Sequence, residues 1–165
     1  MTKTKLFIGI DCGNNTGFSV WDSTNKKFLE VSCYTFWESI DKIIEYACYD
    51  DSLFEITFVV EDVVAHSSTF NATKTYEKTQ GKHNQKIGAV CKQAERVGTV
   101  KDKTTLTLEF LELRKEMFPY MQIKKIAPTK ASATKVKHEY FCNLTKWTKQ
   151  TNEHGRDSAM LVFGR

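Results

Sequence analysis

The chain has 165 residues, a formal net charge of +4, 41% hydrophobic residues and 12% aromatic residues, which are ordinary values for one globular domain spanning residues 1–165. A chain of this length buries roughly 70% of its unfolded surface, so a core can form without disulfides or metals, and collagen-like, disordered and disulfide-scaffold proteins are excluded. No apolar run reaches the roughly 20 residues of a membrane span, and the N-terminal sequence lacks a signal-peptide core. We therefore expect a cytoplasmic protein that does not enter a membrane.

The charges are unevenly distributed along the chain. Residues 1–71 contain 5 Lys/Arg and 11 Asp/Glu, whereas residues 72–165 contain 19 and 9. A basic second half suggests a polyanionic partner, with nucleic acid as the first candidate. The alternative is a solvated lysine-rich surface.

The cysteines and histidines do not form a recognisable metal or disulfide motif. The five cysteines include no C-x-x-C pair, and the four histidines show no paired ligand spacing. This usage is typical of a reduced intracellular protein whose cysteines are small core residues.

The first half of the sequence predicts strands around one helix. Residues 5–11, 16–21 and 28–36 read as an antiparallel three-stranded meander separated by turn residues. A fourth strand at residues 56–60 should lie parallel to its neighbour, because it follows a crossover helix. That helix is predicted from an apolar stripe formed by Trp37, Ile40, Ile44, Ala47 and Cys48.

The second half predicts a long loop, helices and one last strand. Residues 62–82 are polar and aperiodic and read as a loop. The strand is expected at residues 122–126, before helices at about 132–144 and from about residue 153. Two earlier helices are predicted from separate apolar stripes, Ile87, Val90, Cys91 and Ala94, and then Leu106, Phe110, Leu113 and Met117. The predicted fold class is α/β, with a five-stranded mixed sheet flanked by helices on both faces.

Acidic residues stand where predicted elements end or begin. Asp11 closes the first strand and Glu61 the fourth, and carboxylates at neighbouring ends of parallel strands can share a hard divalent cation. His154 and Asp157 have the i, i+3 spacing that places both on one face of the last helix. Each could instead be a solvated turn, strand-end or helix-start residue, and Asp62 is an alternative to Glu61.

Three motifs resemble the RuvC-type Holliday-junction resolvases of the ribonuclease H-like/integrase superfamily. They are IGIDCGNNTG at residues 8–17, VVE at residues 59–61 and HGRDSA at residues 154–159. The motifs occur in the expected order across nearly the whole chain, and the closing motif is the most specific. The order of elements also fits the ribonuclease H-like fold.

The resemblance implies a homodimeric Mg²⁺- or Mn²⁺-dependent endodeoxyribonuclease of DNA recombination and repair, in the cytoplasm of a bacterial or phage-infected cell. Such an enzyme resolves four-way DNA junctions by paired symmetric nicks and uses no nucleotide cofactor. Asp11, Glu61, His154 and Asp157 would be both the catalytic residues and the ligands of two metal ions.

DNA contacts are expected from the basic segment after the last strand. Of its lysines, Lys124, Lys130 and Lys135 are the candidates, because a lysine contacts a phosphate without reading a base. Relatives often carry an aromatic residue three positions after the catalytic Glu, where this chain has Val64. Phe70 or Tyr76 could replace it by stacking on a base, or could pack the loop.

The helix around residues 87–94 resembles the segment through which the family dimerises. Its candidate interface residues are Ile87, Val90, Cys91 and Ala94. A two-fold dimer would supply the two related sites that symmetric cuts need. The stripe could also be ordinary core.

Other functions are compatible with parts of the pattern. The same four site residues would serve a nuclease acting on flaps, other branched DNA or RNA–DNA hybrids. The opening motif also resembles the phosphate-binding hairpin of actin-like ATPases, although these need two such domains. A non-catalytic junction-binding module would not need all four site residues.

Overall fold

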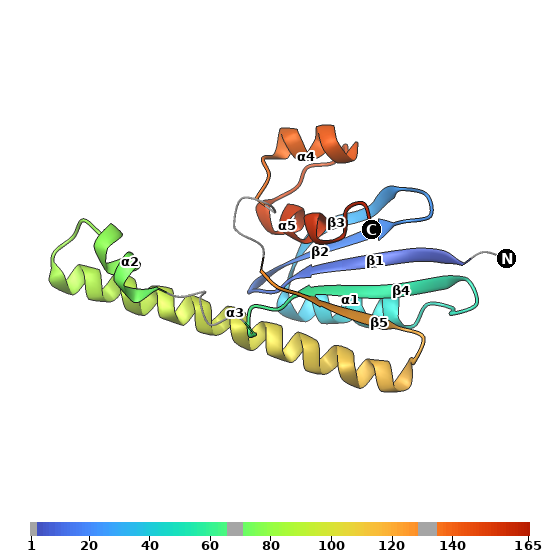
Figure 1. Cartoon of the computed structure of the whole chain (residues 1–165), viewed down its shortest axis with the longest axis horizontal. Coiled ribbons are helices and arrows are strands. Elements are labelled where there is room, and N and C mark those ends of the chain that lie inside the picture. The colour runs from blue at the N-terminus through green and yellow to red at the C-terminus, as the bar shows by residue number, and fades with distance from the viewer. Residues whose placement is uncertain (1–2, 66–70, 129–134) are drawn as a thin grey trace.

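A five-stranded mixed sheet forms the centre of the computed structural model, which describes residues 3–65, 71–128 and 135–165 (Figure 1). The strands are β1 (Thr4–Asp11), β2 (Asn15–Asp22), β3 (Lys27–Thr35), β4 (Phe54–Glu61) and β5 (Gln122–Ile126). The described helices are α1 (Phe36–Ala47), α2 (Ala72–Lys78), α3 (His83–Met117), α4 (His138–Thr145) and α5 (Glu153–Val162). The predicted α/β class is therefore confirmed.

The strand order is β3-β2-β1-β4-β5, with β1 in the middle. β1 pairs antiparallel with β2, which pairs antiparallel with β3, so the predicted meander is confirmed. β4 lies parallel to β1, as expected of a strand after a crossover helix, and β5 continues the parallel half. The carboxyl ends of β1 and β4 therefore lie at the same edge of the sheet.

Alternating side chains divide the sheet into two buried faces. Ile8 and Ile10 point into the core beneath α1 and α3, together with Phe58 of β4. Phe7 and Val59 point the opposite way, into the core formed with α4 and α5. Helices on both faces explain why these strands are almost continuously apolar.

α1 covers the first face with a stripe that matches the predicted one only in part, since Ala47 is buried and Ile40 packs against the core. Thr35 caps the helix by accepting the backbone N–H of Glu38, while the Glu38 side chain accepts the backbone N–H of Thr35. Trp37 was expected to face the core but is 70% exposed, and Cys48 is exposed as well. The buried positions are Phe36, Ser39, Ile43, Tyr46 and Ala47.

α3 is one 35-residue helix where the sequence predicted two. Its buried positions are Thr104, Thr107, Leu108 and Leu111. Of the predicted apolar stripe, Phe110 packs against the core, whereas Leu106, Leu113 and Met117 are exposed. The stripe assignment was wrong because two threonines, which are polar but small, occupy the buried face. Their hydroxyls can bond within the helix, and that of Thr104 donates to the carbonyl of Val100.

The predicted loop at residues 62–82 is partly helical. Its residues 72–78 form α2, capped by Asn71, whose side chain accepts the backbone N–H of Lys74. α2 packs on the first half of α3, and the two project beyond the sheet as an arm (Figure 1). α4 begins at His138, later than predicted, and no helix in the described ranges is long and apolar enough to cross a membrane.

Candidate active site

Asp11 and Glu61 meet at the carboxyl edge of the parallel strand pair. Ile10 is in register with Val60, so the next residues, Asp11 and Glu61, leave adjacent strands together. Side-chain alternation also places both on the face that α5 covers, since Asp11 is two positions after Gly9 and Glu61 two after Val59.

Glycines let α5 approach the sheet closely enough to complete the site. A methyl group on Gly17 would overlap the carbonyl oxygen of His154, and one on Gly9 would overlap the carbonyl oxygen of Ser158. Asn152 caps the helix by accepting the backbone N–H of Gly155 at 2.8 Å. The first turn of α5 is thereby pressed against β1 and β2, beside Asp11.

His154 and Asp11 are in direct contact. The Nδ1 atom of His154 lies 3.4 Å from an Asp11 carboxylate oxygen. The hydrogen bond to Asp11 raises the pKa of His154 above its usual 6.5, despite partial burial. The imidazole is therefore more easily protonated here than in solvent, because the protonated ring would be stabilised by the Asp11 carboxylate.

Asp157 lies one helical turn further along α5. Burial, and then the nearby Asp11 carboxylate, raise the pKa of Asp157 from 3.8 to about 6. Its Oδ1 atom is buried and has no hydrogen-bond partner among the described residues. A carboxylate in this state is a functional-site candidate, because a bound cation would stabilise the charge that burial disfavours.

All four predicted site residues line one cavity of about 1150 Å³. Within the described residues, no three His, Cys, Asp or Glu side chains lie close enough together to hold one metal ion. Most of the remaining lining comes from the turn between β1 and β2 and from α3, and it includes Asn14, Asn15, Gln93, Arg96, Thr99 and Val100.

Asp62, the alternative to Glu61, serves a different purpose. Its side chain accepts the backbone N–H groups of Val64 and Ala65 at 3.0 and 3.1 Å and so shapes the turn after β4. Asp62 is absent from the cavity lining and borders a separate groove against α3. Strand alternation explains the difference, since adjacent residues point to opposite faces.

Cys12 also borders the cavity but is not a nucleophile candidate. Its side chain is buried, and burial raises the pKa of the thiol to about 12 despite hydrogen bonds with Thr107 and Thr104 of α3. The thiol therefore stays protonated at neutral pH and links the loop after β1 to α3.

Of the predicted DNA-binding lysines that the structure describes, one lines the cavity and one does not. Lys135 lines the cavity and forms a 2.6 Å ion pair with Glu153, so it reaches the site edge as expected. Lys124 is exposed and lies over the ring of Phe7 at 5.5 Å, outside the cavity lining. Lys130 lies outside the described residues.

Tyr76, one of the two predicted wedge residues, is not among the described residues that line the cavity. Tyr76 packs α2 onto α3, with its hydroxyl 2.7 Å from Nδ1 of His83 and its ring under Lys86. Phe70 lies outside the described residues. Val64 is exposed and lines the separate groove.

The predicted dimer residues lie on the arm. Ile87 is 44% exposed, Cys91 and Ala94 are exposed, and Val90 is half-buried. They are not ordinary core residues, because each retains contact with solvent.

Arg96 is a site residue that the sequence reasoning missed. It lies on the α3 wall of the cavity, is exposed, and forms no ion pair with any described residue. The position of Arg96 could not be predicted, because the sequence pattern indicates two short helices in place of α3. The face of α3 that turns toward Asp11 was therefore unknown.

Comparisons with known proteins identify no relative. No protein-family model matches the chain, and no curated protein or solved structure matches it either.

Proposed function

We propose that the chain is a metal-dependent endonuclease of the ribonuclease H-like superfamily that nicks four-way DNA junctions. The observation that carries the proposal is that Asp11, Glu61, His154 and Asp157, from three distant parts of the sequence, line one cavity. Two carboxyl groups at the sheet edge and a third on the helix packed against it suit metal-assisted hydrolysis of a phosphodiester.

The fold supports the superfamily assignment. The five-stranded mixed sheet with helices on both faces is the architecture that the sequence resemblance implies. Each of the three motifs contributes residues to the cavity lining. The first supplies Asp11, the second Glu61, and the third His154 and Asp157. Fold and motifs therefore support the same assignment.

The donor chemistry fits Mg²⁺ or Mn²⁺. Carboxylate oxygens are the preferred ligands of these hard cations, and the buried, unpartnered Oδ1 of Asp157 is the atom that would gain most from one. Asp11, Glu61, Asp157 and a neutral His154 would hold the metal, and their side chains would converge further than they do here. When bound, two such ions activate water and stabilise the leaving oxygen.

The cations at the cavity give the chain its own means of positioning a DNA strand. Both Arg96, on α3, and Lys135, in the segment after β5, line the cavity. Both can contact phosphates without selecting a base, which suits recognition of a branched shape.

A homodimer is part of this proposal, since two opposed strands of a junction need two sites related by a two-fold axis. The exposed apolar residues of the arm support self-association.

The test is a Mg²⁺-dependent cleavage assay on a synthetic four-way junction with strand-specific labels. Symmetric paired nicks are expected on the junction. A flap, a linear duplex and an RNA–DNA hybrid run in parallel decide the substrate class, and preferential cutting of one of these would replace the junction assignment with the corresponding nuclease activity.

Variants of the site connect cleavage to the cavity. Asp11→Asn and Asp157→Asn should each lower cleavage by roughly 1000-fold, because each removes a charged ligand, while junction binding is retained. Asp41→Asn is the matched control, since Asp41 is exposed on α1. Wild-type cutting rates in both site variants would exclude this cavity as the active site.

A further inference from the structure

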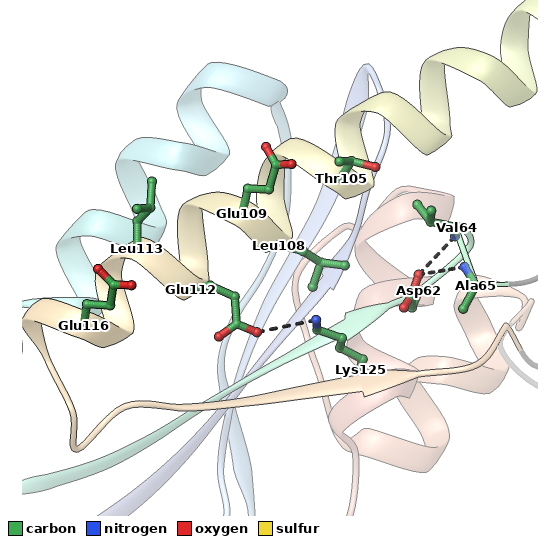
Figure 2. A pocket seen from close by; sticks show the side chains of 10 residues that line it. All are labelled: Asp62, Val64, Ala65, Thr105, Leu108, Glu109, Glu112, Leu113, Glu116 and Lys125. Atoms are coloured by element: carbon green, nitrogen blue, oxygen red, sulfur yellow. Dashed lines mark hydrogen bonds and ion pairs between the residues drawn. The ribbon is translucent and has the colours of Figure 1, made fainter.

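Two further cavities border α3, and their chemistry differs. The first, of about 650 Å³, is the separate groove between α3 and β5 (Figure 2). Its rim carries four carboxylates, those of Asp62, Glu109, Glu112 and Glu116. A rim of this kind repels a nucleic acid. The second is a small pocket of about 170 Å³ with no carboxylate among its described lining residues, which are Val63, Gln93, Arg96, Val97, Val100 and Lys101.

The small pocket adjoins the candidate active site. Four residues line both the pocket and the active-site cavity, namely Val63, Gln93, Arg96 and Val100. A group that occupies the small pocket is therefore next to whatever the active-site cavity binds.

The floor of the small pocket belongs to the side of α3 that faces the core. Val97 precedes the buried residues Thr104 and Leu111 by seven and fourteen positions, which are about two and about four helical turns. α3 continues past the sheet into the arm (Figure 1), and on this side of the helix Val97 and Val100 are only half-buried. An apolar surface that is covered by the sheet elsewhere is therefore accessible to a ligand here.

The polar groups around this apolar floor are unpaired. Arg96 and Lys101 form no ion pair with any residue in the described ranges. The side-chain amide of Gln93 is half-buried and forms no hydrogen bond with a described residue. An amide offers both donors and an acceptor, while two cations favour an anionic ligand.

The size of the small pocket suits one aromatic ring. An apolar cavity of roughly 150 Å³ admits one benzene molecule, and this pocket is slightly larger. A ring that has hydrogen-bonding groups on its edge and an attached phosphate is a nucleotide. Because the space corresponds to a single six-membered ring, the fitting base is a pyrimidine.

We propose that the small pocket takes up one pyrimidine base of the bound DNA strand, beside the position that is cut. Val97 and Val100 contact the ring, and the Gln93 amide bonds its hydrogen-bonding edge. Arg96 and Lys101 contact the flanking phosphates. Base pairs at a branch point lack continuous stacking, so a base leaves the duplex there at a lower cost than inside a linear helix.

This inference rests on the proposed function, because it gives the nuclease a base preference next to its cut. The first test uses four-way junctions that carry a fluorescent cytosine analogue at one position at a time near the branch point. The emission of such an analogue rises when it leaves the base stack. Ca²⁺ replaces Mg²⁺, and a gel verifies that the DNA stays intact. Binding of the wild-type protein should raise the emission at one position about twofold or more.

Val97→Trp should abolish this rise, because the larger side chain fills the small pocket. The matched control is Leu113→Trp, which adds the same side chain to the same helix but in the acidic groove of Figure 2. It should keep the rise. An equal rise in both variants, or no rise at any position of a bound junction, would overturn the proposal.

Cutting preference gives a second test that does not depend on filling a pocket. In junctions randomised near the branch point, the wild-type protein should favour a pyrimidine at one position. Gln93→Leu should reduce this preference about fivefold, because it removes the donors and the acceptor. Gln150→Leu is the matched control, since Gln150 is exposed and lines none of these three cavities. An unchanged preference in Gln93→Leu would contradict base uptake.

Two other occupants of the small pocket are distinguished by binding measurements. Val97→Trp should sediment like the wild-type protein, and a changed oligomeric state would instead assign this face to a contact between copies. Thymidine monophosphate alone should not bind at micromolar concentrations in a calorimetric titration. Tight binding that Val97→Trp abolishes would assign the pocket to a free nucleotide. Either result would overturn the proposal.

These outcomes are separable from the nuclease assignment. Symmetric junction cuts with no base preference and no rise in emission would overturn base uptake alone. A rise that Val97→Trp abolishes, in a protein that cuts no DNA substrate, would overturn the proposed function alone.

Discussion

At the carboxyl ends of β1 and β4, side chains from three distant parts of the chain are pressed together, whereas the arm is two consecutive helices that contact mainly each other. The first region has no free space at Gly9 and Gly17, where an added methyl group would meet the backbone of α5. In the second region Gly88 has open space around it. One chain thus combines a site fixed by close packing with a projection whose surface remains available.

The difference shows where each region obtains its geometry. The candidate active site depends on backbone register and on the distance between α5 and the sheet, so small changes there should affect both stability and activity. The arm depends on local helical hydrogen bonds, so its folding should tolerate surface changes.

Gly17→Ala should have the largest effect. The new methyl group would overlap the His154 carbonyl oxygen and push α5 from the sheet, costing about 3 kcal/mol or more in the free energy of unfolding. Chemical denaturation measures the cost, and cleavage should be lost in the folded fraction. A variant with normal stability and normal cutting would contradict the packing described for this helix.

Leu111→Ala should follow, with a cost of about 3 kcal/mol, because Leu111 is fully buried and its truncation leaves a cavity. Leu106→Ala, on the same helix but 47% exposed, is the matched control and should change unfolding by less than about 0.5 kcal/mol. Similar costs for both leucines would mean that the buried face of α3 is misassigned.

Asp157→Asn should stabilise the metal-free protein. With its pKa raised from 3.8 to about 6, the folded protein retains a proton that the unfolded chain releases, so the contribution of Asp157 to stability falls as pH rises through this interval. After allowance for solvent screening, the gain at pH above 6 should be about 1 kcal/mol.

Thermal unfolding in a chelator at a series of pH values measures this gain, which should shrink as the pH is lowered toward 3.8. The same variant should not cleave DNA. A constant gain at every pH would assign the effect to something other than the buried charge.

Gly88→Ala should have the smallest effect, a stabilisation of roughly 0.5–1 kcal/mol. The residue is inside α3 with no atom within 4 Å of an added methyl group, so alanine improves helix propensity without a clash. Thermal unfolding measures it. A loss of stability instead would show that the arm is packed more tightly at this position than described.

The sheet and the approach of Asp11 to Glu61 could be predicted because they depend on strong local signals. Phe7–Ile10 and Val59–Val60 are apolar runs that end at carboxylates, and a strand after a crossover helix is normally parallel. His154 and Asp157 were predicted from their i, i+3 spacing and from the motif resemblance. The contact of His154 with Asp11 depends on Gly9 and Gly17, whose role only the packed helix reveals.

The faces of the helices could not be predicted, for a physical reason. On α3, Thr104 and Thr107 take buried positions while Leu113 and Met117 remain exposed, so hydrophobicity alone selects the wrong side. On α1, Trp37 is strongly hydrophobic but exposed, so hydrophobicity again selects the wrong face of the helix. The separate groove against α3 is lined in part by Leu113, one of these exposed apolar residues.

The unbroken length of α3 has a mechanical consequence. At 1.5 Å per residue, its 35 residues span roughly 52 Å, and no flexible linker interrupts them between the arm and the core beneath the sheet. A continuous helix holds the tip of the arm at a fixed distance from the carboxylates at the sheet edge. The number of helical turns between them sets that distance.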